Sequence, residues 1–149
     1  MRPSPYGRVS LLQPGQGRGP ELARFNLAAN DEYWNWQISP DGAQIALFEP
    51  AGGKIYLLSL DGHPSRQISL KNWNSLYNLN WAADGKSLFV SNPTPRGSAL
   101  LRVDLSGNTR TVFEQKGGLA TWGIPSPDGH RLAMAEWNIS SNVWMLSDF

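Results

Sequence analysis

Three aspartates recur at a regular spacing and are the first candidates for chemistry in this chain. Each precedes a glycine, and the pairs lie 43 and 44 residues apart, at Asp41, Asp84 and Asp128. Repeated carboxylates could ligate a metal, but Asp-Gly is also a tight-turn sequence, in which glycine supplies a positive φ. A calcium loop needs several oxygen ligands within one short segment, and no such segment occurs. We therefore interpret the three aspartates as turn residues and expect no metal site.

The remaining residues offer no catalytic constellation. Both histidines, His63 and His130, follow an Asp-Gly pair, and the sequence contains no cysteine. Zinc-site spacings, the Gly-x-Ser-x-Gly elbow of α/β-hydrolases and glycine-rich phosphate loops are all absent from the sequence. We expect a protein without catalytic residues, cofactor or metal.

Aromatic and polar residues that precede each Asp-Gly pair are the ligand-contact candidates. Strand alternation places the aromatic rings on one face, where large rings most often fill the interior between packed layers. The alternative is that they stack on a sugar, peptide or aromatic ligand. The loops before these strands would gather at one mouth, and loops held by a rigid scaffold commonly carry binding residues, although solvated loops are polar in any case. The candidates are Asp31, Glu32, Trp34, Trp73, Asn74, Tyr77 and Trp122.

Two landmarks share one period along the chain. Each Asp-Gly pair is followed by an apolar strand, and a further apolar run begins at Val9, Ile55, Leu100 and Val143. A period of about 40 to 45 residues with four short strands per repeat is typical of β-propeller blades. No segment has the apolar spacing and caps of a helix. The sequence therefore predicts an all-β fold made of four-stranded antiparallel blades.

Two of the repeats carry a family resemblance. Residues 38–46 and 126–133 resemble the Ser-Pro-Asp-Gly-x-x-(Ile/Leu)-Ala core of TolB-like, WD40-like (PD40) propeller repeats, and residues 54–62 match the next strand and turn. The middle repeat keeps Asp-Gly but has Ala82-Ala83 in place of Ser-Pro. Residues 122–146 are similar to the closing blade of propellers fused to bacterial Ser/Thr kinases and winged-helix regulators. The resemblance implies a signalling module.

The strand pattern divides residues 1–149 into a single partial propeller of about three blades. We expect a half blade at 7–28, with a loop over 14–20, whole blades at 33–70 and 77–114, and a three-stranded final blade at 121–149. Complete rings have typically 4 to 8 blades, so two apolar blade faces would stay open. Either the chain is the C-terminal part of a longer propeller, or two copies form a six-bladed ring. In that ring the final blade would take its fourth strand, Leu22–Asn26, from the other copy. Val9–Leu12 would then be a surplus third strand, displaced or disordered.

Charge and hydropathy limit the kinds of binding partner that we expect. The formal net charge is +1, with no block of five like charges, so we expect neither nucleic-acid binding nor attraction to an anionic membrane. No apolar run reaches the roughly 18 residues of a membrane span, and the first residues make a poor signal peptide. As written, the chain should stay in the cytoplasm; as a fragment of a membrane-anchored parent, it would be periplasmic.

The sequence thus favours a non-catalytic propeller module that binds a protein, peptide or small ligand at its mouth, as the C-terminal part of a bacterial signalling protein. The alternative is the accessory propeller of a peptidase or other hydrolase whose catalytic domain lies elsewhere. A third hypothesis is a degenerate remnant that folds poorly. As a ligand contact on a loop, Trp73 should be replaceable by alanine without loss of stability.

Overall fold

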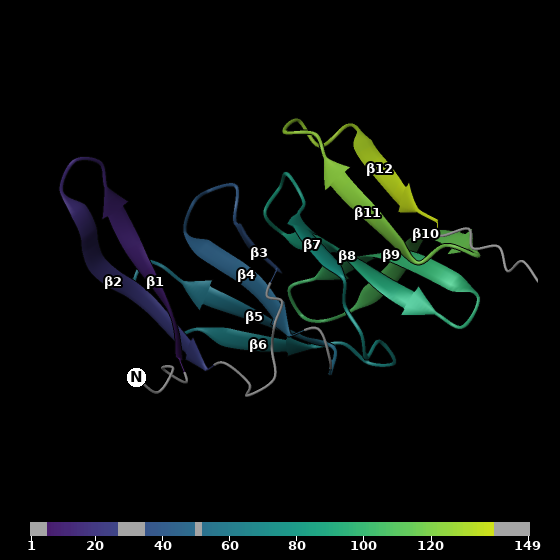
Figure 1. Ribbon diagram of the computed structural model, residues 1–149, viewed down its shortest axis with the longest axis horizontal. Helices are drawn as coiled ribbons and strands as arrows, with labels where there is room; N and C mark the ends of the chain where they lie inside the picture. The colour runs from purple at the N-terminus through teal and green to yellow at the C-terminus, as the bar shows by residue number, and fades with distance from the viewer. Residues whose placement is uncertain (1–5, 27–34, 50–51, 139–149) are drawn as a thin grey trace, which may run out of the picture.

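The computed structural model describes residues 6–26, 35–49 and 52–138, and these ranges form twelve strands and no helix (Figure 1). The predicted all-β fold is confirmed. The strands are β1 (Tyr6–Gln13), β2 (Gly17–Asn26), β3 (Asn35–Ile38), β4 (Gln44–Glu49), β5 (Lys54–Ser59), β6 (Arg66–Ser69), β7 (Asn78–Trp81), β8 (Ser87–Thr94), β9 (Gly97–Asp104), β10 (Thr109–Lys116), β11 (Ala120–Pro125) and β12 (Leu132–Trp137).

The strands form four antiparallel sheets, in each of which neighbours in sequence are also neighbours in space. The hairpin β1–β2 is followed by the sheets β3–β4–β5–β6 and β7–β8–β9–β10 and then by the hairpin β11–β12. Figure 1 shows them side by side in chain order, with the two hairpins at opposite ends. The strand expected at residues 143–146 lies outside the described residues. The loop expected over residues 14–20 is shorter than predicted, because Gly15 and Gly17 adopt positive φ and β2 begins at Gly17.

The three Asp-Gly turns have the geometry that the sequence predicts. Gly42, Gly85 and Gly129 have φ values of 74°, 65° and 73°, a region that residues with a Cβ rarely adopt. Each glycine N–H donates to the carbonyl three residues earlier, at 2.9 to 3.0 Å. These turns connect β3 to β4, β7 to β8 and β11 to β12, so each blade begins with the same hairpin.

The main core lies between the two four-stranded sheets. Phe48, Ile55 and Leu57 from the first sheet pack with Leu79 and other apolar side chains of the second. Most of these side chains are at most 2% exposed, and burial of such side chains is the main source of stability. Polar contacts also cross between sheets: Trp81 Nε1 donates to the Gln37 carbonyl at 3.0 Å.

The sheet β3–β6 is covered only in part on its other face. The hairpin β1–β2 brings Val9, Ala23 and Phe25 against a second cluster of Ile45, Leu47 and Leu58. On the same face, Trp36 is 61% exposed and Ile38 52% exposed. The interpretation that the rings before each Asp-Gly pair fill the space between blades holds for Trp81, which is buried. Trp36 is exposed because no described strand covers the inner half of this face, and its place between blades stays a prediction.

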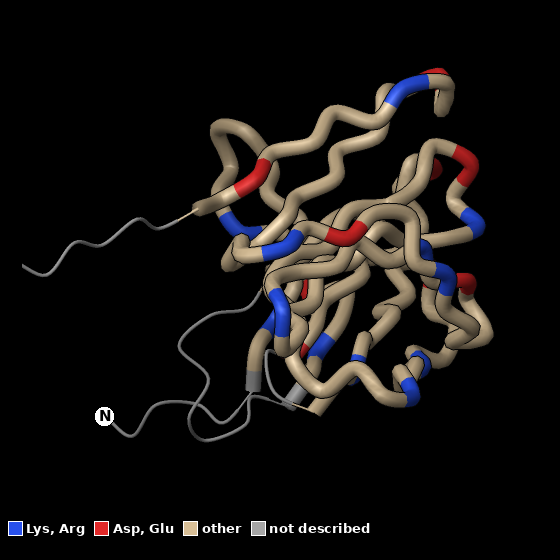
Figure 2. The backbone as a smooth tube through the Cα atoms, turned by 90° about the vertical axis from the view of Figure 1, so that its right-hand side faces the viewer, with Lys and Arg blue, Asp and Glu red and all other residues tan. Residues whose placement is uncertain are grey.

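Charged residues do not gather on one side of the described chain. Figure 2 shows Lys and Arg interspersed with Asp and Glu along the backbone.

Candidate functional site

The sequence predicts a mouth formed by the loops before β3, β7 and β11. Asp31, Glu32 and Trp34 of this prediction fall outside the described residues. The other four candidates, Trp73, Asn74, Tyr77 and Trp122, are among the described residues, and no two of them share a hydrogen bond or a ring contact.

Trp73 and Asn74 lie on the loop before β7, and both are tied to the framework. The ring of Trp73 is half-buried against the main core, and its carbonyl lies so close to Gly53 that a Cβ there would be 1.9 Å away. The Asn74 carbonyl accepts from Gly52 N–H at 2.8 Å, while the residue is exposed. The side chain of Asn74 is therefore accessible to a ligand, whereas part of the Trp73 ring is used for packing.

Tyr77 and Trp122 belong to different surfaces. Tyr77 is 49% exposed at the start of β7. Trp122 contacts Trp137 on β12, with ring centroids 5.7 Å apart and planes tilted by 32°. Its strand neighbours Thr121 and Gly123 contact β7–β10, so alternation turns Trp122 away from that sheet.

A cleft lies at the opposite end of the strands from the predicted mouth. It has a volume of about 480 Å³ and separates the second Asp-Gly turn from the third. Its lining residues are Ala82, Ala83, Asp84, Phe89, Arg102, Pro125, Pro127, Asp128, Gly129, His130, Arg131 and Leu132.

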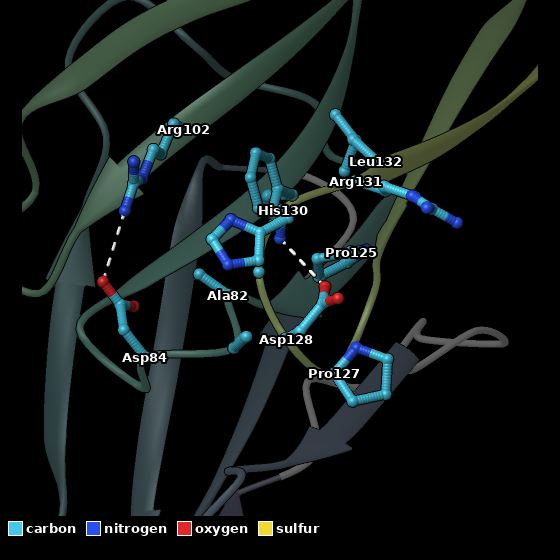
Figure 3. A pocket seen from close by; sticks show the side chains of 12 residues that line it. Ala82, Asp84, Arg102, Pro125, Pro127, Asp128, His130, Arg131 and Leu132 are labelled. Atoms are coloured by element: carbon cyan, nitrogen blue, oxygen red, sulfur yellow. Dashed lines mark hydrogen bonds and ion pairs between the residues drawn. The ribbon is translucent and has the colours of Figure 1, made fainter.

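One wall of the cleft is an ion pair between strand β9 and the β7–β8 turn of the same sheet. Arg102 on β9 donates through Nε to the Ser87 hydroxyl at 2.8 Å and approaches Asp84 Oδ2 at 3.4 Å. Both charged side chains are about half exposed, so the pair itself adds little stability. In Figure 3, His130 lies between this pair and Asp128, and the Arg131 guanidinium points away from the pair.

The other wall is the third turn, which holds its carboxylate rigidly. The Ser126 hydroxyl and the backbone N–H of His130 both donate to Asp128 Oδ1. These hydrogen bonds, the serine's first, hold the pKa of Asp128 below its ordinary value. In the first turn, donation from the Ser39 hydroxyl and the Ala43 N–H lowers the pKa of Asp41 in the same way. The carboxylate Oδ1 of Asp128 therefore already accepts two hydrogen bonds from within its own turn.

Sequence reasoning missed the cleft because it treated the Asp-Gly turns as connectors. Arg102, His130 and Arg131 received no role as ligand contacts. One signal was available: the middle turn lacks the Ser-Pro of the others, and in the structure Asp84 instead meets Arg102. A turn that loses its internal serine needs a donor from elsewhere, and this donor forms the cleft wall.

Two further properties can be stated of the described ranges. No group of three or more His, Asp or Glu side chains there is arranged to hold a metal ion. Within the same residues, no helix has the length and hydropathy to cross a membrane.

Comparison with known proteins supports the fold. No protein-family model and no curated protein sequence matches the chain. A candidate TolB protein from Agrobacterium tumefaciens has a similar structure, with a TM-score of 0.59 at 21% identity over 77% of this chain and 40% of that chain. Candidate 6-phosphogluconolactonases from Bacteroides uniformis and Bacteroides fragilis have TM-scores of 0.58 and 0.50, at 21% and 22% identity.

The two Bacteroides matches cover 86% and 75% of this chain and 40% and 34% of those chains. The present chain therefore spans 40% or less of the length of these three structures. At such identities the likeness is one of fold: the described sheets are blades of a β-propeller. The likeness to propellers of kinases and winged-helix regulators stays a prediction.

Proposed function

We propose that this chain is a non-catalytic β-propeller module that binds a protein or peptide partner at the cleft between its second and third Asp-Gly turns. The observation that carries the proposal is the composition of the cleft, in which a few polar groups face one another across apolar surface. Binding sites commonly combine these two features. The apolar surface comes from Ala82, Phe89, Pro125 and Leu132, and the polar groups are Asp84, Arg102, Asp128, His130 and Arg131. Asp84 already pairs with Arg102, and Asp128 already accepts hydrogen bonds within its own turn.

An acidic side chain of the partner fits these walls best. Arg102 has five N–H donors, of which the described contacts with Ser87 and Asp84 use two. The remaining donors, together with a ring N–H of His130, can donate to a carboxylate at the open side of the cleft. Both residues are held by strands and a hydrogen-bonded turn, which is the usual support of a binding loop.

In its wider context, we place the module in a bacterial signalling protein, as the C-terminal sensory or interaction part. The support is the sequence likeness of residues 122–146 to the closing blades of such proteins. A neighbouring kinase or winged-helix reading frame would favour this role. A neighbouring Gly-x-Ser-x-Gly hydrolase would instead favour an accessory role beside an enzyme.

The test is an NMR titration with short capped peptides that differ in one central residue, aspartate or asparagine. The acidic peptide should shift backbone signals of cleft residues, and the asparagine peptide should shift them far less. The response should disappear in His130→Ala. The chain offers a matched control in His63→Ala, because His63 also follows an Asp-Gly pair but lies outside the cleft lining.

Three results would contradict the proposal. Equal shifts of cleft residues with both peptides would refute the preference for an acidic side chain. Shifts confined to Trp73, Asn74 and Tyr77 would move the site to the mouth. Turnover of a peptide or lactone substrate by the purified chain, abolished by one substitution among the described residues, would refute its non-catalytic character.

A further inference from the structure

One face of the sheet β3–β6 is half covered. Cross-strand pairing puts Trp36 beside Leu47 and Ile38 beside Ile45, so these residues share a face. Leu47 and Ile45 are buried under the hairpin β1–β2, while Trp36 and Ile38 are more than half exposed. The hairpin therefore covers the outer strands and leaves the inner strand β3 bare.

The last hairpin presents a second apolar face. Trp122, Ile124 and Trp137 lie on the side of β11–β12 that is turned away from β7–β10. Ile124 is 57% exposed and Trp137 is 56% exposed, with the exposed Ala133 and Ala135 between them. Contiguous apolar surface of this kind marks an interaction site.

The two hairpins are complementary halves of one blade. The hairpin β11–β12 is closed by an Asp-Gly turn, as are β3–β4 and β7–β8, so it supplies the two inner strands. The hairpin β1–β2 begins one repeat before β5 and packs β2 against β5, so it supplies the two outer strands. Together they have the four strands of each whole sheet.

We propose that a second copy of this chain closes the propeller, with β11–β12 of each copy covering Trp36 and Ile38 of the other. Each chain then contributes two whole blades and two halves, and a pair gives six blades, within the range of known rings. The strand that the sequence predicts at residues 143–146 lies outside the described residues. In the proposed ring, β1 of the other copy fills the third position of the shared blade.

The contact between the first and second sheets predicts which residues of the two copies would touch. Counted back from the aspartate of its turn, Gln37 is fourth and Trp81 is third, and these residues touch across the first and second sheets. Ile124 is likewise fourth before Asp128, and Ile38 is third before Asp41. The same stacking therefore places Ile124 of one copy against Ile38 of the other, where both lose their exposure.

The test is the mass of the chain in solution, by light scattering over a concentration series. We expect a dimer near twice the 16.5 kDa of the chain. Trp36→Glu and Trp137→Glu should each raise the dimer dissociation constant by more than about tenfold, as expected for central aromatic contacts. The control is Val112→Glu on β10, an exposed apolar position (43%) outside both faces, which should leave the dimer intact.

Mixing the two glutamate variants separates this arrangement from other dimers. In the mixture, one interface joins two unaltered faces, so a heterodimer should form although neither variant dimerises alone. Circular dichroism and thermal unfolding should show that each variant is folded. A monomeric wild-type chain, ill-defined aggregates, or a dimer that only one of the two variants disrupts would overturn the proposal. None of these outcomes depends on the peptide-binding cleft.

Discussion

The three turns at Asp41, Asp84 and Asp128 share one backbone geometry. The side-chain partner of the aspartate differs between them. In the first and third turns, a serine hydroxyl donates to the carboxylate and also accepts the N–H that follows the turn. In the middle turn, Ala82 replaces the serine, and Arg102 approaches Asp84 from β9. The change removes a local hydrogen bond and adds a contact between strands, which creates the polar wall of the cleft.

Replacing a turn glycine should be costly for backbone reasons alone. A Cβ added to Gly42 would meet no atom within 4 Å, so Gly42→Ala tests only the strain of a φ of 74°. We expect a loss of about 1 kcal/mol in the free energy of unfolding, measured with urea. Gly42→Asn should lose less, because asparagine tolerates this region. Equal stability of the alanine variant and the wild type would contradict the turn assignment.

The turn carboxylates predict a loss of stability in acid. Hydrogen bonds lower the pKa of Asp41, Asp61, Asp104 and Asp128 in the folded chain. Their contribution is present above the unfolded-state pKa, about 4, and disappears as the pH falls through the lower folded values. The melting temperature should therefore drop as the pH falls below about 4.

The serine donors provide the matched variants for this pH dependence. In Ser39→Ala with Ser126→Ala, the two hydroxyls that lower the aspartate pKa values are gone, so the acid-induced drop in melting temperature should be smaller than in the wild type. The comparison uses the difference between pH 6 and pH 3 within each protein, because the substitutions also lower stability at neutral pH. An unchanged difference would show that these hydrogen bonds do not form in solution.

At the scale of elements, the two interfaces between neighbouring sheets differ in the kind of contact that holds them together. The interface between the first and second sheets is mainly apolar, with one hydrogen bond from Trp81 Nε1 to the Gln37 carbonyl. The interface between β7–β10 and β11 has more polar contacts. Thr121 and Ser98 are both fully buried, with their hydroxyl oxygens 2.6 Å apart. A close approach at Gly123, where a Cβ would meet Leu100 at 2.6 Å, completes this contact.

The buried hydroxyl pair can be tested by a double-mutant cycle. Thr121→Val should cost about 1–3 kcal/mol in urea unfolding, because it leaves the Ser98 hydroxyl buried without its partner. Adding Ser98→Ala should cost less than the sum of the two single changes, since both polar groups are then removed. Strictly additive losses would mean that the two hydroxyls do not interact.

The position of Trp73 changes one expectation drawn from the sequence. A loop tryptophan was expected to be replaceable without loss of stability, but its ring packs against the main core. We now expect Trp73→Ala to lower the free energy of unfolding by about 2 kcal/mol, by removal of buried apolar area. Chemical denaturation measures this directly, and an unchanged midpoint would restore Trp73 as a free ligand contact.

The sequence predicted the fold well because its signals are local. Asp-Gly turns and alternating strands at one period depend on nearby residues, and both appear in the structure. Burial of Trp36 or Trp73 depends on which blade lies opposite, and the cleft depends on Arg102 meeting a turn 18 residues away. Contacts between such distant segments cannot be predicted from the period of the repeat.

At the scale of the whole molecule, the row of sheets has an apolar face at each end that no described blade covers. Figure 1 shows the outer half blade β1–β2 at one end and the inner half blade β11–β12 at the other. Each end exposes large apolar side chains on the face where a neighbouring blade would stack. Closure of a ring would bury both faces through a single kind of contact.

The most direct test of this account is a cross-link between the two faces. The chain has no cysteine, so Ile38→Cys and Ile124→Cys each carry a single thiol, and a bismaleimide can join them only if they are close. With an affinity tag on one variant, we predict a covalent dimer that contains one chain of each kind, and no dimer from either variant alone. Cross-linking of Ile38→Cys to itself, or no cross-link in the mixture, would contradict the closed ring.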